Sequence, residues 1–226
     1  MRRLLVLALV AACAPPPEPD THANGLYRAM RSCLAEAEPS GDCTLVDRAR
    51  DFVVIKDDDP AKPTAWLIVP DVEVTGIEDS RTLDPPVVEF WRYGWEVGQA
   101  LLPRPPEGIG LAINSVAGRS QNLLHIHISC VDPVVARTLA ATRIGPDWAA
   151  EPFLTLAGDA YNVRKVASLD RSPFLLLAEL PGANEDKGAQ SLGVIGAADG
   201  GFYIVTDSTE PGVVAEAEAL LDEDCR

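Results

Sequence analysis

The stretch Leu-Leu-His-Ile-His-Ile-Ser-Cys, at residues 123–130, alternates polar and apolar side chains from His125 to Ser129. This alternation is the strongest indication of the fold. Side chains alternate between the two faces of a β-strand, so His125, His127 and Ser129 share one face and the two isoleucines between them share the other. The isoleucine face suits a hydrophobic core. Three polar side chains in a row on an apolar strand cost free energy unless they border a solvated cleft. The stretch therefore predicts a core strand with one face on a cleft.

Three roles fit two histidines on one face of a strand. His125 and His127 can act as two metal ligands, but the third histidine of the chain, His22, lies in the N-terminal tail, so a carboxylate would have to complete the shell. They can also be satisfied buried histidines without a function. In the third role one imidazole attacks phosphorus and the other orients it or the departing oxygen. Two imidazoles on the same face favour this third role.

The elements on either side of this strand predict an α+β fold. Strands are expected at 52–55, 66–69, 108–115, 162–167, 191–197 and 201–206, and helices at 26–38, 85–102, 131–142 and 211–221. The turn-forming residues at 57–63 and at 199–200 predict hairpins, hence antiparallel pairing. Strands in hairpin-connected runs with helices between them are typical of the α+β class.

The best-defined of these helices follows Asp84, an expected N-cap, and Pro85, an expected first helical residue. Its apolar side chains fall on one stripe, formed by Val87, Trp91, Trp95, Gly98 and Leu102. This periodicity predicts an amphipathic helix packed on a sheet, with its tryptophans in the core.

Length and charge limit the function further. A chain of 226 residues fits one domain with a short tail. Its formal net charge is −15, and it contains no cluster of Lys and Arg interrupted by aromatic residues. Such a surface repels a phosphate backbone, so we do not expect the protein to bind nucleic acid.

The N-terminus predicts export. Arg2 and Arg3 precede a short apolar run that ends at Ala14, as in a secretory signal, and the run is too short to span a bilayer. Val-Ala-Ala-Cys, at residues 10–13, resembles the lipobox of bacterial lipoproteins, in which the cysteine is lipidated; the alternative is an ordinary signal cleaved near Ala14. The expected organisation is a signal peptide at 1–13, a Pro-rich linker at 14–25 and a domain at 26–226. We expect the protein on the periplasmic side of a bacterial membrane, anchored through Cys13.

The remaining four cysteines predict two disulfide bonds, because an even number in an exported chain is typical of disulfides. Three pairings are possible. Cys33 and Cys43 flank a nine-residue loop and pair most simply with each other, which leaves Cys130 for Cys225. A zinc site is the rival interpretation, but it lacks a close cysteine pair at the usual ligand spacing.

The opening stretch and the residues before it carry a family resemblance. Asn-Ser-Val-Ala-Gly-Arg-Ser-Gln-Asn at 114–122, followed by the His-Ile-His-Ile-Ser run, resembles the signature of the histidine triad superfamily, and the segment 57–70 resembles its first hairpin. Segments 111–115, 118–122, 125–130 and 171–179 resemble the CDP-diacylglycerol pyrophosphatases, with a likeness that runs from about Cys33 to Cys225. The resemblance implies an antiparallel sheet like that of the histidine triad (HIT) proteins, with flanking helices.

The chain departs from the superfamily pattern at three positions. Ser129 stands where the third histidine would be, Asn122 where Ser or Thr is usual, and Ala65 where many members have a histidine. Ser129 and Asn122 agree with the pyrophosphatase pattern and argue against a purine nucleoside phosphoramidase.

The resemblance implies hydrolysis of CDP-diacylglycerol to CMP and phosphatidate. His127 matches the nucleophile of the superfamily, which would attack the phosphorus bound to cytidine and form a cytidylyl-histidine that water then opens. The chemistry requires no metal or other cofactor if cationic and N–H donors suffice. The substrate would be met at a membrane surface, where an anchor at Cys13 replaces affinity by effective concentration.

The resemblance also implies roles for residues around the nucleophile. Hydrogen bonds to the transferred group are expected from His125, Gln121, Asn122 and Ser129, with Ser129 or the backbone near it orienting His127. Candidate charge partners of the β-phosphate are Arg119, alternatively a solvated loop residue, and Lys56, alternatively paired with the acidic turn 57–59. Asp57 matches the acid that holds ribose hydroxyls, or caps its turn, and Asn114 either touches the ligand or fixes a turn.

Two other functions fit the same features. One is a periplasmic hydrolase of soluble nucleoside diphosphate derivatives, because nothing in the strand motif recognises acyl chains. The other is a nucleotide-binding lipoprotein without turnover, in which Ser129 marks the loss of catalysis.

Overall fold

A computed structural model describes residues 25–36, 38–149 and 151–226. The expected signal peptide, Cys13 and most of the Pro-rich linker lie outside the described residues. Within them, no helix has the length and apolar character needed to cross a membrane.

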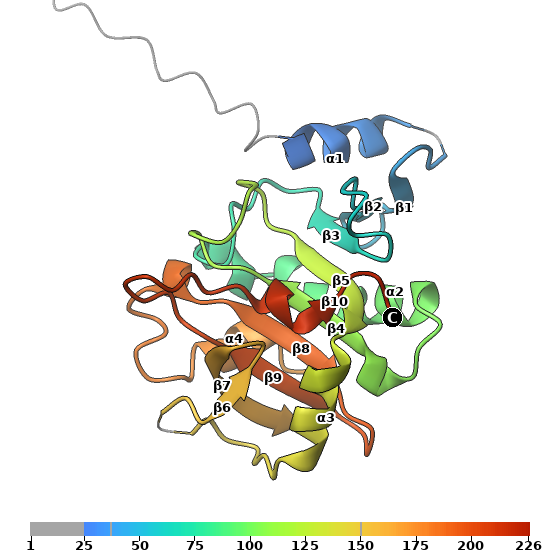
Figure 1. Ribbon diagram of the computed structural model, residues 1–226. Helices are drawn as coiled ribbons and strands as arrows, with labels where there is room; N and C mark the ends of the chain where they lie inside the picture. Colours follow the sequence, from blue (N-terminus) through green and yellow to red (C-terminus); the bar gives the residue numbers. More distant parts are fainter. Residues whose placement is uncertain (1–24, 37, 150) are drawn as a thin grey trace, which may run out of the picture.

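An antiparallel sheet organises the described residues (Figure 1). Its neighbouring strands follow the order β1-β2-β3-β5-β4-β8-β9-β7-β6, and β10 pairs with β5. The strands are β1 Cys43–Asp47, β2 Phe52–Lys56, β3 Trp66–Pro70, β4 Ile109–Ile113, β5 Ile126–Val131, β6 Leu154–Leu156, β7 Asp159–Val166, β8 Leu192–Gly196, β9 Phe202–Thr206 and β10 Leu221–Asp222. The predicted α+β class with an antiparallel sheet is confirmed, although β1, β6 and β10 were not expected.

Short helices surround this sheet (Figure 1). The α-helices in the described part are α1 Gly25–Ala35, α2 Phe90–Leu101, α3 Pro133–Ala141 and α4 Pro173–Leu177. The 3-10 turns are η1 Ser80–Leu83, η2 Val87–Glu89, η3 Pro106–Gly108, η4 Lys187–Ala189 and η5 Ala217–Leu220. Helix α1 ends three residues before the predicted end, and α4 was not predicted.

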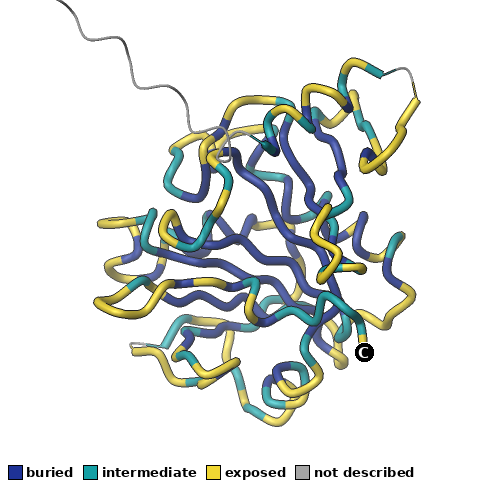
Figure 2. Tube along the Cα trace, turned by 45° about the horizontal axis from the view of Figure 1, so that its top comes forward, coloured by how far each residue is buried: buried dark blue, intermediate teal, exposed yellow. Residues whose placement is uncertain are grey.

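Strand β5 lies near the centre of the sheet, between β3 and β4. Ile126 and Ile128 are fully buried in the main core, as the alternation predicted. The histidine face of the strand is buried too, because His125 and His127 are only 7% and 6% exposed. Figure 2 shows this buried centre, with exposed residues gathered in the loops around it. The two histidines therefore occupy a sheltered site rather than an open surface.

The stripe predicted for α2 is confirmed. Trp91 is fully buried, Trp95 is nearly so, and Gly98 is close enough to Ile109 and Ile128 that a Cβ there would lie 3.1–3.2 Å from their side chains. The expected start of the helix is wrong. Asp84 ends the preceding turn η1, and the α-helix begins only at Phe90, after η2.

The helix predicted at 211–221 is wrong, and this difference shapes the site. The segment instead runs beside the loop that follows β4: Ser115 N donates to Ala215 O at 3.1 Å, and Asn114 forms a backbone bridge with Glu216. Only the turn η5 and the short strand β10 are regular there. Tertiary hydrogen bonds replace those that an isolated helix would have made.

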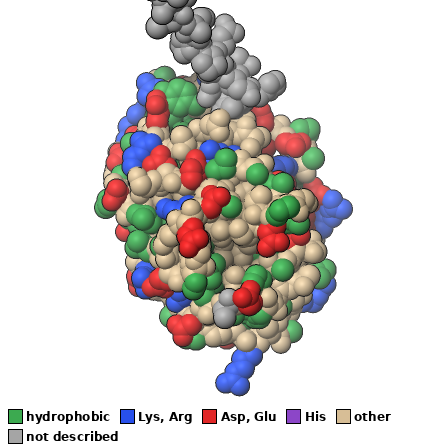
Figure 3. Space-filling view, turned by 90° about the vertical axis from the view of Figure 1, so that its left-hand side faces the viewer, with side chains coloured by type: hydrophobic (Ala, Val, Ile, Leu, Met, Phe, Trp, Pro, Cys, Tyr) green, Lys and Arg blue, Asp and Glu red, His purple; other side chains and the backbone are tan. Residues whose placement is uncertain are grey.

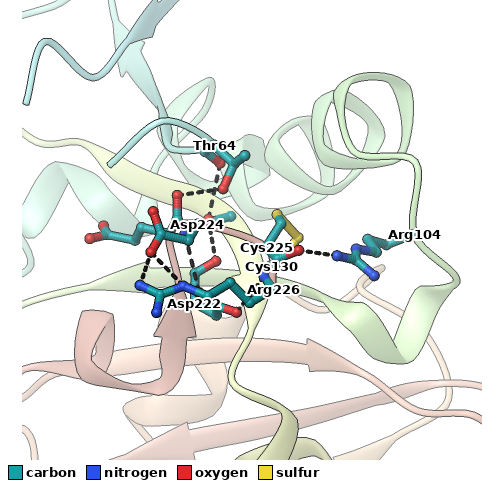
Figure 4. The surroundings of a disulfide bond; sticks show 9 residues. Thr64, Arg104, Cys130, Asp222, Asp224, Cys225 and Arg226 are labelled. Carbon is teal, nitrogen blue, oxygen red and sulfur yellow. Dashed lines mark hydrogen bonds and ion pairs between the residues drawn. A yellow bond between two sulfur atoms is a disulfide. The ribbon is translucent and has the colours of Figure 1, made fainter. Parts of the chain in front are cut away.

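Both predicted disulfide bonds are present. Cys33 pairs with Cys43, with Cα atoms 5.6 Å apart, and Cys130 pairs with Cys225 at 5.2 Å. Figure 4 shows how the second bond fixes the C-terminal segment to β5, where Arg104 also donates to the carbonyl oxygen of Cys225.

Candidate active site

A polar cavity of about 560 Å³ lies among α1, the β2–β3 turn, the loop after β4 and η5. Both predicted catalytic histidines line it. The other predicted site residues on its wall are Asn114, Arg119, Gln121, Asp57 and Lys56. Asn122 and Ser129 do not line it.

His127 has the features of a nucleophile. Its Nδ1 lies 3.1 Å from Oε1 of Glu218, at ion-pair distance but without the geometry of a hydrogen bond, and its Nε2 is without a hydrogen-bond partner in the described part of the chain. Burial lowers the pKa of His127 to about 3, and the neighbouring His125 and Lys62 act in the same direction against the effect of Glu218. The imidazole is therefore neutral near pH 7, and when Nδ1 carries the proton, Nε2 keeps a free electron pair.

His125 is held in one tautomer. Its Nδ1 lies 2.7 Å from the carbonyl oxygen of Leu123, and because a carbonyl only accepts, Nδ1 must carry the proton. Burial lowers the pKa of His125, so the ring is neutral and its Nε2 is an acceptor. The two rings meet edge to face with centroids 4.9 Å apart. His125 is thus suited to accepting a proton rather than donating a hydrogen bond.

Glu218, on η5, is the site residue that the sequence did not reveal. Its Oε2 accepts from Nδ2 of Asn114 at 2.8 Å, and its backbone N–H donates to Oδ1 of Asn114 at 3.1 Å. Asn114, predicted to touch ligand or to fix a turn, therefore clamps Glu218. The available signal was the group of acidic residues within 211–221, a segment for which a helix was predicted. Glu218, rather than Ser129, is the residue placed to orient His127.

The hydroxyl of Ser129 has other partners than those predicted. It is fully buried, and its hydroxyl lies 3.0 Å from the carbonyl oxygen of Thr64 and 3.3 Å from that of Asp222. It holds the C-terminal segment and the β3 side of the sheet together. Because the hydroxyl is engaged there, the structure does not support the predicted hydrogen bond from Ser129 to the transferred group.

The two predicted cations are on the cavity wall with partners of their own. Arg119 forms a two-point ion pair with Glu78, at 2.6 and 2.8 Å. The ammonium of Lys56 donates to the carbonyl oxygens of Ala65 and Lys62, at 2.8 and 2.9 Å, rather than to the acidic side chains of the neighbouring turn. Burial lowers the pKa of Lys56. Both charges border the cavity in fixed positions.

The remaining predicted ligands make local contacts. Gln121 accepts from the backbone N–H of Leu26 at 2.9 Å and so ties the start of α1 to the cavity rim. Asn122 is exposed and accepts from Arg119 at 3.4 Å. Asp57 accepts from the N–H of Asp59 at 3.0 Å, which is the capping role considered as its alternative, although Asp57 also lines the cavity.

One cluster at the cavity has metal-ligand chemistry. A nitrogen of His127 and one carboxylate oxygen each from Glu218 and Glu223 all lie within 4.8 Å of one another. The ammonium of Lys62 forms ion pairs with both carboxylates, at 3.3 Å from Oε1 of Glu223. Lys62 supplies one positive charge against the two carboxylates, so a side chain neutralises part of the charge of the cluster.

The fold and the site together define a class of protein. It is an antiparallel α+β protein whose central strand presents two neutral histidines to a polar cavity, an arrangement suited to nucleophilic attack on phosphorus. Among solved structures, a HIT family hydrolase from Clostridium thermocellum is similar over 46% of this chain and 91% of its own, with 21% identity and a TM-score of 0.37. Yeast Ap4A phosphorylase Apa2 is similar over 78% of this chain and 67% of its own, with 17% identity and a TM-score of 0.46.

Residues 21–226 match the sequence profile of the CDP-diacylglycerol pyrophosphatases, and the chain belongs to this family. The family is one of hydrolases, so the chain is a hydrolase of nucleotide derivatives. This agrees with the resemblance noted in the sequence.

Proposed function

We propose that the protein hydrolyses CDP-diacylglycerol to CMP and phosphatidate through a covalent cytidylyl intermediate on His127. The observation that carries the proposal is the neutral, buried imidazole of His127, whose Nε2 has no hydrogen-bond partner among the described residues and which lines a polar cavity. Membership of the family supports the substrate.

In the first step the electron pair on Nε2 of His127 forms a bond to the phosphorus attached to cytidine. The bond from that phosphorus to the bridging oxygen breaks, and phosphatidate leaves with the electron pair. The ring, which keeps its proton on Nδ1, becomes positively charged. Glu218, 3.1 Å from Nδ1, stabilises this charge as it develops.

In the second step water attacks the same phosphorus, and the electron pair of the N–P bond returns to Nε2 of His127. The water loses one proton, for which Nε2 of His125 is the acceptor, and CMP is released. His125 later returns this proton to solvent. Splitting the displacement in two allows one cavity to serve both steps.

The positive charge needed around the diphosphate comes from the cavity wall. Lys56 and Arg119 are fixed there by hydrogen bonds and an ion pair, and a fixed charge requires little reorganisation when substrate binds. We propose that they border the phosphate that departs with the lipid.

The site of action is part of the proposal. The lipobox-like run ending at Cys13 supports a protein anchored on the periplasmic side of a bacterial membrane, where the lipid substrate is concentrated. Cys13→Ala should move the protein from the membrane fraction to the soluble fraction. Its turnover of a soluble CDP-alcohol should be unchanged, whereas retention on the membrane would contradict the anchor.

The intermediate is the direct test. An N–P bond is labile in acid but survives mild alkali, so a rapidly mixed reaction is quenched at high pH and digested. Substrate labelled in the cytidine half should leave label on the peptide that contains His125 and His127, and substrate labelled in the acyl half should leave none. Label from the acyl half would reverse the orientation of the substrate, and fast turnover without label would favour direct attack by water.

The same assay separates the other two functions. CMP release is compared between CDP-diacylglycerol and soluble CDP-alcohols. A preference for the soluble compounds would identify a hydrolase of soluble nucleoside diphosphate derivatives. Binding of CDP compounds without any turnover would identify a nucleotide-binding protein.

A further inference from the structure

A second carboxylate, Glu223, lies behind the proposed nucleophile and formed no part of the predicted site. One of its oxygens lies within 4.8 Å of both a nitrogen of His127 and an oxygen of Glu218. Its Oε1 is 3.3 Å from Nζ of Lys62, which also pairs with Glu218. The group behind the imidazole therefore consists of two carboxylates and one ammonium.

The fold delivers Glu223 to this position through several independent contacts. The preceding strand β10 pairs with β5, and the backbone N–H of Thr64 donates to the carbonyl oxygen of Glu223 at 2.9 Å. The hydroxyl of Ser129 lies 3.3 Å from the carbonyl oxygen of Asp222, the residue before Glu223, and Cys225, two residues after Glu223, forms a disulfide bond with Cys130 of β5. Figure 4 shows this segment beside Thr64 and the disulfide bond. These contacts fix the backbone of Glu223 next to the site.

The net charge of the cluster of Glu218, Glu223 and Lys62 determines how many protons the two carboxylates bind. With His127 neutral, two ionised carboxylates against one ammonium leave an excess negative charge in a sheltered position, which is costly. One proton removes the excess. We propose that Glu223 is a positioning residue for the proposed reaction: it shares one proton with Glu218, so that a single negative charge, balanced by Lys62, faces Nδ1 of His127. The expected effect of Glu223 on the reaction rate rests on the proposed function, whereas the protonation of Glu223 does not.

The titration behaviour of the cluster supports this geometry. Burial raises the pKa of Glu223 to about 7, with further contributions from a hydrogen bond to Glu218 and the charge of Glu218, and against the effect of Lys62. Burial alone would raise the pKa of Glu218, but the hydrogen bonds with Lys62 and Glu223 and the charge of Lys62 act against burial and lower that pKa. Outside the cluster, Lys56 faces Glu223 and Asp57 faces Lys62. Glu218 accepts hydrogen bonds from Asn114 and Lys62, whereas Oε1 of Glu223 has no hydrogen-bond partner in the described part of the chain, so we place the shared proton on Glu223.

Loss of this proton would change the field on the nucleophile. Above pH 7 a second negative charge stands behind Nδ1, and it stabilises the positive charge that the ring acquires during attack. The rate of the first step should therefore rise as the pH passes through 7, even though the ring of His127 is neutral throughout this range.

The proton can be observed without any turnover, because the chain has only three histidines. The full-length protein in detergent, labelled with ¹⁵N in its imidazoles, is titrated from pH 5.5 to 8.5, with His22→Gln and His125→Gln used for assignment. The ring nitrogens of His127 should remain in the neutral form and show a small inflection near pH 7. Glu223→Gln should remove the inflection. Its absence from the wild type, or its persistence in E223Q, would overturn the inference.

Kinetics on CDP-diacylglycerol provide the second readout. In the wild type kcat should rise about three- to tenfold between pH 6 and 8, with a much smaller change in KM. E223Q should show no rise over the same pH range. Asp224→Asn, which removes the next carboxylate, paired with Arg226, should keep the rise. A rise that E223Q retains would overturn the inference, whereas a wild type inactive on this substrate would instead contradict the proposed function and leave the NMR test valid.

Discussion

The behaviour of single residues at this site depends on which atoms already have partners. His127 keeps Nε2 free, His125 is fixed by Leu123, and Asn114 holds Glu218. A nucleophile needs an unshared electron pair and a fixed orientation at the same time. Burial keeps the ring of His127 neutral and so preserves the electron pair, and Glu218 fixes the orientation of the ring.

Replacing the nucleophile gives the most direct prediction at this scale. His127→Ala should reduce kcat on CDP-diacylglycerol to about a thousandth or less, because the attacking atom is removed. His125→Ala should leave slow turnover. Far-ultraviolet circular dichroism and thermal melting should show an intact fold for both variants. More than about a tenth of wild-type kcat in His127→Ala would contradict the assignment, since even loss of a general base costs ~10²–10⁴-fold.

Glu218 and its clamp should act as one unit. Glu218→Gln keeps the shape but removes the charge facing Nδ1, so kcat should fall about 10²-fold. Asn114→Ala releases the carboxylate and should cost about tenfold. In a double-mutant cycle, the second substitution should add little to the first, because both act on the same contact. Independent, additive losses would show that Asn114 acts on substrate instead.

A buried acid, Asp207, that does not line the cavity should make stability depend on pH. Burial raises the pKa of Asp207 to about 6, and Asp159 and Glu216 add to this against the hydrogen bond from Ser191. The folded state thus holds a proton that the unfolded state loses near pH 4, so this residue's contribution to the free energy of unfolding falls as the pH rises from about 4 to 6. Asp207→Asn should raise the free energy of unfolding by about 1–3 kcal/mol at pH 8 and change it little at pH 4. Urea unfolding at the two pH values is the measurement, and an equal effect at both would contradict the assignment.

At the scale of elements, β5 joins the core, the site and the C-terminal segment. Its isoleucines face the core, His127 and the preceding His125 line the cavity, and Ser129 bonds to the segments on both sides. The departure from the superfamily at Ser129 therefore has a structural account. A small hydroxyl fits where β10 and Thr64 come together.

Removing this hydroxyl should affect stability and turnover together. Ser129→Ala removes the one O–H donor that the half-buried carbonyl oxygens of Thr64 and Asp222 share, which should cost about 1–2 kcal/mol in the free energy of unfolding. Turnover should fall as well, because the same segment carries Glu223. Ser168→Ala, which removes a surface hydroxyl bonded to Asp170, is the control and should change neither quantity. Unchanged stability in Ser129→Ala would show that the bonds contribute nothing net.

At the scale of the whole molecule, two covalent links fix the ends of the fold to the sheet. The Cys33–Cys43 bond spans ten residues, whereas the Cys130–Cys225 bond spans 95 and connects β5 to the C-terminal segment. Acidic side chains are spread over the face shown in Figure 3 without a continuous apolar patch. The cross-links therefore stabilise a molecule whose like charges repel.

The two bonds should differ in their effect. In the chain-entropy model, removing Cys130–Cys225 by paired Ala substitutions costs about 5 kcal/mol, against about 3 kcal/mol for Cys33–Cys43. Only the first should also lower kcat, since it releases the segment that carries Glu223. Guanidinium unfolding and turnover of each variant measure the two effects. Equal losses of activity from both pairs would contradict this placement.

Features that depend on local periodicity, or on a small number of possible combinations, could be predicted before the structure was known. Alternation along 123–130 placed the isoleucines in the core and the histidines on one face, and the helical stripe from Trp91 to Leu102 identified the buried side of α2. Four cysteines allow only three pairings, and loop length selected the one that the structure contains.

The residues that contact the histidines could be identified only from the tertiary structure. Glu218 lies 104 residues from Asn114, in a largely irregular segment for which the sequence predicted a helix. Ser129 has its partners in Thr64 and Asp222, at separations of 65 and 93 residues. Such contacts follow no period in the sequence. They arise because buried polar groups take whichever partner the packed sheet and its disulfide-tied end bring within hydrogen-bond distance.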